Sequence, residues 1–224
     1  MFHKIIRYFR YMLTPRNDGN FFEYHKSNYK KCKYDVSGTK NKFCSKQAIF
    51  INSKFDYAGN NNLAIFNNSK IKNTAIMCDG DNNQLIVGNN CVLNGVIIWF
   101  GGCNNKIIVG DNTVISQGCE LTCGNNNELI IGNSCLFAKN CHIFCTDGHK
   151  ILSKDGKRLN EDKNISIGNH VLIFHGSYVL KGSKIGDNSV VGSKSSICGS
   201  NHKANSLIVG TPAETIKEDI TWEE

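Results

Sequence analysis

Apolar and polar residues alternate along most of this chain in short runs that end at glycine or asparagine. The runs "NNQLIVGNNCVL", "NNKIIVGDNTVI" and "NNELIIGNSCLF" repeat with 22 residues between their glycines, which are Gly88, Gly110 and Gly132. A weaker copy, "NNLAIFNNSKI", puts Phe66 at the corresponding position. The same phase resumes at Gly168 and Gly186, which are 18 residues apart. A fixed period of about 20 residues is typical of solenoid proteins.

Four columns of small or apolar residues follow each of these positions, at the third, fifth, ninth and eleventh residue after it. In the first four repeats the columns are Ser69, Cys91, Thr113 and Cys135; Ile71, Leu93, Ile115 and Phe137; Ala75, Ile97, Cys119 and Cys141; and Met77, Trp99, Leu121 and Ile143. Inward positions two residues apart predict three short strands per repeat, because side chains of a strand alternate between its faces. One repeat cannot bury such columns alone, so neighbouring repeats must stack. The pattern predicts an all-β, parallel β-solenoid.

Asparagine and cysteine fit this prediction in different ways. Asparagine is frequent between the predicted strands, and it tolerates the left-handed conformation that tight corners require. Four of the eleven cysteines, Cys91, Cys119, Cys135 and Cys141, fall in the inward columns, so we expect them to fill the core rather than bind metal or catalyse. Cys119 and Cys141 would stack one coil apart, within disulfide reach, but a reducing compartment favours free thiols.

The charge of the chain is uneven. The net charge is +7, and residues 1–46 hold eleven Lys or Arg against three acidic residues. The apolar residues of the first turns lie on one face of a predicted helix: Phe2, Ile5, Ile6, Phe9, Met12 and Leu13. Such a segment either docks on the main domain or contacts anionic lipid or a polyanionic substrate. Nucleic acid is disfavoured, because no binding motif accompanies the charge.

We therefore expect three parts: a basic, partly helical segment at 1–46, a solenoid at 47–211 with a protruding loop at 146–164, and a tail at 212–224. No run of apolar residues is long enough for a membrane span, and the first residues do not resemble a secretory signal. The sequence thus predicts a cytoplasmic protein.

The repeat breaks at "HIFCTDGHKIL", His142 to Leu152, and a polar, charged stretch follows. Long loops on repeat scaffolds often carry function, so we expect residues 146–164 to wall a site for a hydrophilic substrate. His149 stands at the exit of the coil, and an imidazole that is mostly neutral at cytoplasmic pH can accept a proton. His142 falls between two inward columns and is expected to be an outward-facing strand residue.

Several motifs, in order, resemble the hexapeptide-repeat acyltransferases, and most closely the O-acetyltransferases of capsular polysaccharides and polysialic acid. They are "TDGH" with Asp147 and His149, the loop residue Asn160, the second glycine ladder, and the closing Gly210, Pro212 and Ala213. The resemblance covers about residues 60–217. It implies a left-handed parallel β-helix, a homotrimer, acetyl-CoA as donor and no metal.

The resemblance also assigns roles to residues. It makes His149 the general base and puts Asp147 beside it, either to orient the imidazole or to bind the acceptor. Acceptor contacts fall on Thr146, Asn160 and His175. Donor contacts fall on Leu172, Phe174, Lys181, Gly182, Ser193, Lys194, Lys203 and Pro212.

Two departures from the family pattern concern the donor or acceptor pocket. The family's His-Val-Trp-Ile-Gly reads "HVLIF" here, so Leu172 replaces an indole and Phe174 replaces a glycine. The family's Pro-Pro is replaced by "SNHKANS", in which Lys203 is either a contact for a CoA phosphate or a solvated loop residue.

These observations predict an acetyl-CoA-dependent O-acetyltransferase that acts on a hydroxyl of a bacterial surface glycan or its precursor, by direct transfer in a ternary complex. A smaller acceptor, such as serine, a nucleotide-linked amino sugar or an antibiotic, is the main rival. A non-catalytic solenoid whose acyl pocket is closed by Phe174 is another. A metal hydratase of the γ-carbonic-anhydrase type would use His170 and His175, but no third histidine occurs at a matching place.

A homotrimer is also expected from outward positions that are apolar: Val92, Ile98, Ile108 and Ile130. A lone solenoid in water should not expose such residues, so another subunit or the N-terminal segment should cover them.

Overall fold

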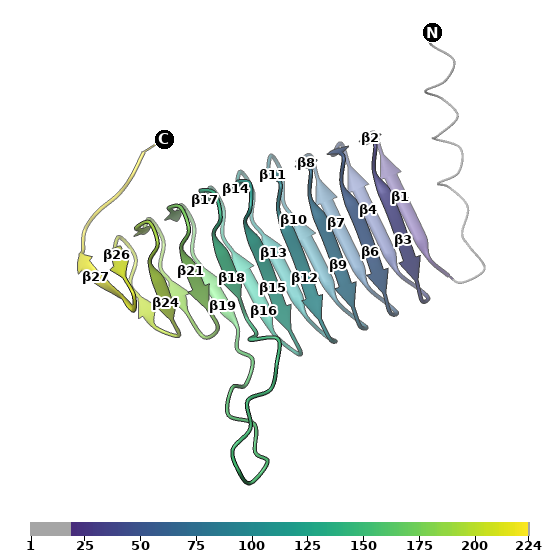
Figure 1. Cartoon of the computed structure of the whole chain (residues 1–224). Coiled ribbons are helices and arrows are strands. Elements are labelled where there is room, and N and C mark those ends of the chain that lie inside the picture. Colours follow the sequence, from purple (N-terminus) through teal and green to yellow (C-terminus); the bar gives the residue numbers. More distant parts are fainter. Residues whose placement is uncertain (1–18, 224) are drawn as a thin grey trace.

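The structure is a computed structural model that describes residues 19–223, and these residues form one parallel β-solenoid (Figure 1). No helix occurs within this range. The amphipathic helix predicted for Phe2 to Leu13 lies outside the described residues. None of the described elements is a helix long and apolar enough to span a membrane.

Three sheets form the sides of the solenoid, and each coil contributes one strand to each side. Sheet A contains β1 (Phe21–His25), β4 (Lys42–Lys46), β7 (Leu63–Asn67), β10 (Gln84–Val87), β13 (Lys106–Val109), β16 (Glu128–Ile131), β19 (Ile165–Ile167), β22 (Lys184–Ile185) and β25 (Asn201–His202). Sheet B contains β2 (Asn28–Lys30), β5 (Ile49–Ile51), β8 (Lys70–Lys72), β11 (Val92–Asn94), β14 (Val114–Ile115), β17 (Leu136–Phe137), β20 (Leu172–Ile173), β23 (Val190–Val191), β26 (Leu207–Gly210) and β27 (Ala213–Lys217). Sheet C contains β3 (Lys33–Ser37), β6 (Lys54–Ala58), β9 (Ala75–Asp79), β12 (Ile97–Gly101), β15 (Glu120–Gly124), β18 (His142–Phe144), β21 (Tyr178–Leu180) and β24 (Ser196–Cys198).

The coil is left-handed. In Figure 1 the chain rises along sheet A at the back, crosses the top in sheet B and descends along sheet C at the front, while it advances from the N-terminal to the C-terminal end. This path is opposite in hand to ordinary parallel crossovers, which are right-handed. The hand and the all-β solenoid agree with the resemblance.

The interior is a continuous apolar column, and the predicted cysteines belong to it. Cys91, Cys119, Cys135 and Cys141 are buried, and all the cysteines are free thiols. Their thiols donate to backbone carbonyls of the coil, as Cys119 Sγ does to Ala138 O at 2.9 Å. The prediction that these thiols fill the core is confirmed.

A ladder of buried asparagines lines the corner between sheets C and A, here called the C–A corner. The side-chain oxygen of each asparagine accepts the backbone N–H of its counterpart in the next coil, at 2.8 to 3.4 Å, from Asn20 through Asn41, Asn62, Asn83 and Asn105 to Asn127. Hydrogen bonds to such buried groups are costly to lose, since an unpaired buried group costs about 1–3 kcal/mol. The ladder therefore fixes the stacking of the first six coils.

The column register was wrong in the early coils. Ile76 and Ile98 are fully buried, whereas Met77 and Trp99 lie on the outer face and Ile97 is exposed. Ala75 likewise lies outside the core. The corner between sheets B and C, the B–C corner, is one residue longer from the Gly110 repeat onward. Counting from the glycine therefore misses the inward face by one position in the two earlier repeats. Ile98 is therefore no support for a trimer.

Phe66 was also aligned one residue out. It pairs in register with Val87 rather than with Gly88, because the corner that follows it is one residue shorter. Phe66 is fully buried.

The solenoid is longer than predicted at both ends. Strands β1 to β4 pair in parallel with the later strands of the three sheets, so residues 21–46 belong to the β-helix rather than to a separate basic segment. At the other end, β27 pairs antiparallel with β26 and extends sheet B into the predicted tail at 212–224. The β-helix thus spans β1 to β27.

Candidate active site

The coil opens once, between β18 and β19, and a loop projects from the C–A corner there (Figure 1). Its base is fixed on both sides: Lys163 N–H donates to Cys145 O at 3.1 Å, and Gly182 N–H donates to Asn164 O at 3.0 Å. Further out, Leu152 and Arg158 form an antiparallel bridge, so the loop is a small hairpin. The prediction that residues 146–164 leave the solenoid is confirmed.

Asn160 connects the two arms of this hairpin. Its side-chain oxygen accepts the Ile151 N–H at 2.7 Å, and its amide nitrogen donates to His149 O at 2.8 Å and to Asp147 Oδ2 at 2.7 Å. The Asn160 side chain thus bonds to the first and last residues of "DGH" and to the backbone just after them. The loop residue that the resemblance selected is the one that shapes the loop.

The Asp147 carboxylate bonds to Asn160 and Lys181 rather than to the imidazole. Lys181 reaches it from the next coil through Nζ and also donates to Asn160 O at 3.1 Å. Burial by itself would raise the pKa of Asp147, but the hydrogen bonds from Lys181 and Asn160 and the nearby positive charges together lower it. Asp147 therefore remains ionised and ties the loop to the coil. Lys181, assigned to the donor, is engaged in this pair.

The root of the loop packs against Gly124. A Cβ added there would lie 2.6 Å from Thr146 Cβ and 2.9 Å from Asp162 Oδ2, so only glycine leaves room for the loop to return. Asp162 is nearly buried and accepts a 2.8 Å hydrogen bond from Arg158. Thr146 is buried and its Oγ1 accepts the Gly148 N–H at 3.1 Å, so it shapes the turn before His149.

His149 is exposed, and within residues 19–223 its imidazole makes no hydrogen bond or ion pair. Gly148, just before it, has a φ of +75°, and a Cβ added there would contact nothing within 4 Å. The turn is therefore open to solvent where it carries the exposed ring. The backbone is therefore fixed through Asn160 while both ring nitrogens stay available to a ligand.

His142 lies on a different surface. It faces outward from β18, stacks on Tyr178 with ring centroids 4.8 Å apart, and approaches Glu120 Oε2 at 3.7 Å. The expected outward orientation is confirmed, and the residue is not part of the loop.

The other predicted contacts gather at the B–C corner. Phe174 and His175 form this corner in one coil, and Lys194 N–H of the next coil donates to His175 O at 2.9 Å. Ser193 and Pro212 lie at the same edge, and Leu172 lies in the adjoining β20. Six residues of nearly extended chain, about 20 Å, separate His175 from Lys181. One chain therefore does not bring this corner to His149.

Lys203 lies at the third edge, the A–B corner, and pairs there with Glu218 at 3.6 Å. Both side chains are mostly exposed, and such pairs contribute little to stability, so the lysine can exchange this partner for another anion. Gly182 lies beside Lys181 at the C–A corner, where a Cβ would meet Lys163 Cδ at 3.2 Å.

Comparison with known proteins finds one family model that matches part of the chain and solved structures of the same architecture. The family described as bacterial transferase hexapeptide (six repeats) matches residues 164–199, which are the coils that follow the loop. The solved structure of the polysialic acid O-acetyltransferase OatWY superposes with a TM-score of 0.75 and 28% identity, over 88% of this chain and 90% of that one. The polySia-specific acetyltransferase NeuO superposes with a TM-score of 0.71 and 25% identity, over 93% and 90%. The coils after the loop thus match the hexapeptide transferase model, and the β-helix as a whole is similar to those of two O-acetyltransferases. Among curated proteins, no match was found.

The two histidines of the metal-hydratase alternative do not converge in the structure. His170 lies at the A–B corner, where its ring stacks on Trp222 at 4.3 Å and its carbonyl accepts the indole N–H at 2.8 Å. His175 lies at the B–C corner. Over the described range no group of three His, Cys, Asp or Glu side chains is placed to hold a metal ion.

Sequence reasoning missed two contacts of the loop: the Asp147–Lys181 pair and the Arg158–Asp162 pair. The first joins residues of different coils, so it requires the exact stacking of the loop root on β21. The second joins opposite charges four residues apart. That spacing predicts a contact on a helix but not in an irregular loop.

Proposed function

We propose that this protein is a CoA-dependent O-acetyltransferase that acetylates a hydroxyl of an anionic bacterial surface glycan, with His149 as general base. The observation that carries the proposal is the loop 146–164, in which Asn160 holds the backbone of an exposed His149 at the exit of the coil. The similarity to two polysialic acid O-acetyltransferases over about nine tenths of each chain supports the choice of reaction.

The proposed reaction is attack of a sugar hydroxyl on a thioester. A neutral imidazole of His149 takes the hydroxyl proton as the oxygen bonds to the thioester carbon. The tetrahedral intermediate then expels the CoA thiolate, which takes that proton from the imidazolium, so the products are the acetyl ester and CoA thiol. Positioned base catalysis of this kind typically contributes 10²–10⁴ in rate.

The donor is proposed to bind at the B–C corner of a neighbouring subunit. Ser193, Lys194 and Pro212 gather at that edge, away from the loop of their own chain. A homotrimer, in which the loop of one subunit meets the B–C corner of the next, brings His149 and the donor contacts together. Exposed Phe174 then lies against the donor, where the family has a glycine.

The outer face of sheet A supports such an assembly. Four isoleucines lie in register across adjacent strands, all only half-buried in the single chain: Ile65, Ile86, Ile108 and Ile130. An aliphatic ridge of this kind is typical of a surface that another subunit covers.

We expect sedimentation equilibrium to give the mass of three 24.9 kDa chains at micromolar concentration. Replacing Ile86 and Ile108 by Glu should dissociate the assembly and abolish turnover together, since the site would then be incomplete. A stable, active monomer would refute the shared site.

The loop favours an anionic acceptor. Arg158 is paired with Asp162 and Glu161, and Asp147 is paired with Lys181. Arg158 balances only one of its two carboxylates, so the remaining exposed loop charges are Lys150, Lys154, Lys157 and Lys163 against Asp155 and Glu161. Such charges attract an anionic chain at long range, and salt should weaken the attraction.

The proposal is tested by release of CoA thiol from acetyl-CoA with sialylated oligosaccharides, neutral maltooligosaccharides and nucleotide-linked amino sugars, followed by mass spectrometry of the products. We expect the sialylated chain to be the best acceptor, to carry a base-labile O-acetyl ester, and to show a KM that rises with salt. Transfer to amino groups alone would refute O-acetylation, and equal activity on neutral chains would refute the anionic acceptor.

A further inference from the structure

The N-terminal end of the solenoid exposes aromatic side chains that the rest of the fold would bury. The inward residues of the first coil, β1 to β3, are only partly buried: Phe22, Tyr24, Tyr29, Cys32, Tyr34 and Val36. Each packs on a buried residue of the second coil, as Tyr29 does on Phe50 with ring centroids 4.7 Å apart and Tyr34 on Phe55 at 4.8 Å. They also pack on one another, as Tyr24 does on Tyr29 at 4.7 Å, yet none of them is fully buried.

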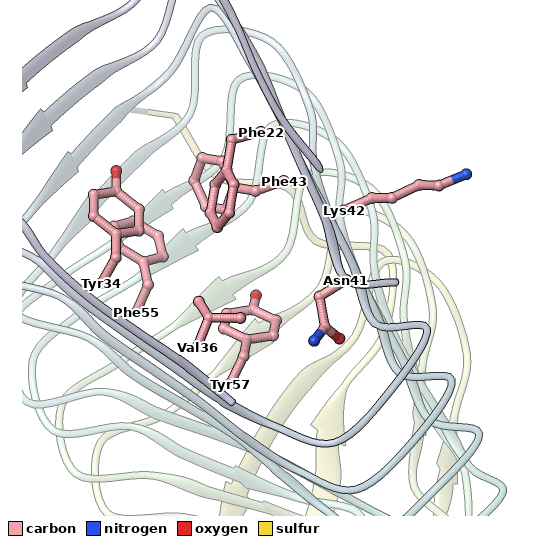
Figure 2. Close-up of a pocket in the computed structure, with 8 residues that line it drawn as sticks. All are labelled: Phe22, Tyr34, Val36, Asn41, Lys42, Phe43, Phe55 and Tyr57. Atoms are coloured by element: carbon pink, nitrogen blue, oxygen red, sulfur yellow. The ribbon is translucent and has the colours of Figure 1, made fainter. Parts of the chain in front are cut away.

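A shallow hollow lies at this end, inside the first coil (Figure 2). Its walls are the rings of Phe22 and Phe43 on one side and of Tyr34, Phe55 and Tyr57 on the other. Tyr57 is only 6% exposed, and its hydroxyl has no hydrogen-bond partner within the described chain. The hydroxyl is buried, so the surface that the hollow exposes is apolar, and apolar surface is stabilised when it is covered.

The C-terminal end is closed differently. There β27 turns back antiparallel on β26, and Ala213 at its start is buried. Repeat proteins need such terminal caps, because an end coil otherwise leaves one side of its core in water. The N-terminal end has no counterpart to β27 among residues 19–223.

We propose that residues 1–18 of the same chain cap this end, with apolar side chains of the segment packed on the partly buried aromatic residues of the first coil. The segment joins the first coil at Gly19, so it is tethered next to the hollow at high effective concentration. Its apolar residues share one predicted helical face: Phe2, Ile5, Ile6, Phe9, Met12 and Leu13. This inference is independent of the proposed reaction.

Charge determines which face of the segment is turned inward. The first coil is itself basic at Lys26, Lys30, Lys31 and Lys33, so it repels the basic residues of the segment rather than attracting them. The apolar face is the one that gains by contact, and Lys4, Arg7 and Arg10 stay in water.

Cys32 reports on the cap directly. It is an inward, half-buried thiol of the first coil, and burial raises its pKa, which slows its reaction with alkylating agents. Cys198, exposed in β24 at the far end, serves as the internal reference. We expect Cys32 of the full chain to react with a maleimide much more slowly than Cys198, with both sites read by peptide mass spectrometry.

The test variant is the full chain with Ile5→Asp and Phe9→Asp, and the matched control carries Lys4→Gln and Arg7→Gln. We expect Cys32 labelling to speed up by about tenfold or more in the first and to stay unchanged in the second, because opening of a cap raises local reactivity. Equal Cys32 rates in the wild type and the aspartate variant would overturn the proposal. Protection that appears only at high protein concentration, or only with anionic lipid vesicles, would overturn it in favour of a second copy or a membrane.

Discussion

Replacing His149 with alanine is expected to lower kcat by about 10²–10⁴-fold, with acetyl-CoA affinity and thermal stability nearly unchanged. The imidazole is exposed and bonds to no residue of its own described chain, so its removal leaves no cavity and no unpaired partner. The loss should therefore appear in the chemical step. Thiol release measures kcat, calorimetry measures donor affinity, and a melting curve confirms the fold.

His142→Ala is the matched control, because it removes an imidazole from β18, the strand that leads into the loop. His142 stacks on Tyr178 on the outer face of sheet C, away from the loop network. We expect near-normal turnover. If the His149 variant kept more than about a tenth of wild-type activity while the His142 variant lost it, His149 would not be the base.

Asn160→Ala is expected to lower kcat by about 10- to 100-fold, because small displacements of a catalytic group are costly. The substitution removes the hydrogen bonds to Ile151 N, His149 O and Asp147 Oδ2 at once, so the backbone that carries His149 is released. The hairpin lies outside the coil, so the melting temperature should change little while hydrogen exchange in residues 146–164 increases. Steady-state kinetics and exchange mass spectrometry measure the two effects.

Asn160→Asp tests whether the hydrogen bonds of Asn160, rather than the size of its side chain, position His149. The substituted side chain can still accept the Ile151 N–H, but it cannot donate to Asp147, and it places a second carboxylate beside it. We expect it to be no better than alanine at neutral pH. Asp155→Ala, an exposed position at the tip of the hairpin, should be close to wild type. Full activity of both Asn160 variants would show that the hairpin does not position His149.

The periodicity was enough to predict the architecture, and the reasons for its errors are local. From Gly110 onward the counted columns, such as Leu121 and Ile143, are buried as expected. Before that point the B–C corner is one residue shorter, and a one-residue slip turns a strand over. Trp99 was therefore assigned to the core in place of Ile98. Only the pairing of the strands reveals the length of each corner.

The first coil escaped detection because it fills the same positions with different residues. Tyr29 and Tyr34 stand where later coils have aliphatic residues, and the surrounding lysines suggested a separate basic segment. The signal that was present is the asparagine spacing, since Asn20 and Asn41 continue the ladder of Asn62. Short-range composition thus obscured a long-range repeat.

The site was predicted in its parts but not in its connections. The motif placed Asp147, His149 and Asn160 in one loop, and the structure adds that Asn160 bonds to the backbone of His149. Lys181 pairs with Asp147 of the adjacent coil. This contact depends on how the coils stack, so the sequence spacing does not predict it. Contacts between the proposed subunits are harder still to predict from the sequence of one chain.

The most direct test of the central claim, that His149 is the base for acetyl transfer, is the pH dependence of kcat/KM in the wild type and in His149→Ala. We predict that the wild-type value falls on the acid side as the base becomes protonated, and that the variant lacks this limb. Asp147 cannot produce it, because Lys181 and Asn160 outweigh its partial burial and lower its pKa, so it stays ionised until the pH falls below the ordinary carboxylate range. The same acid limb in both proteins would show that another group takes the proton and would contradict the assignment.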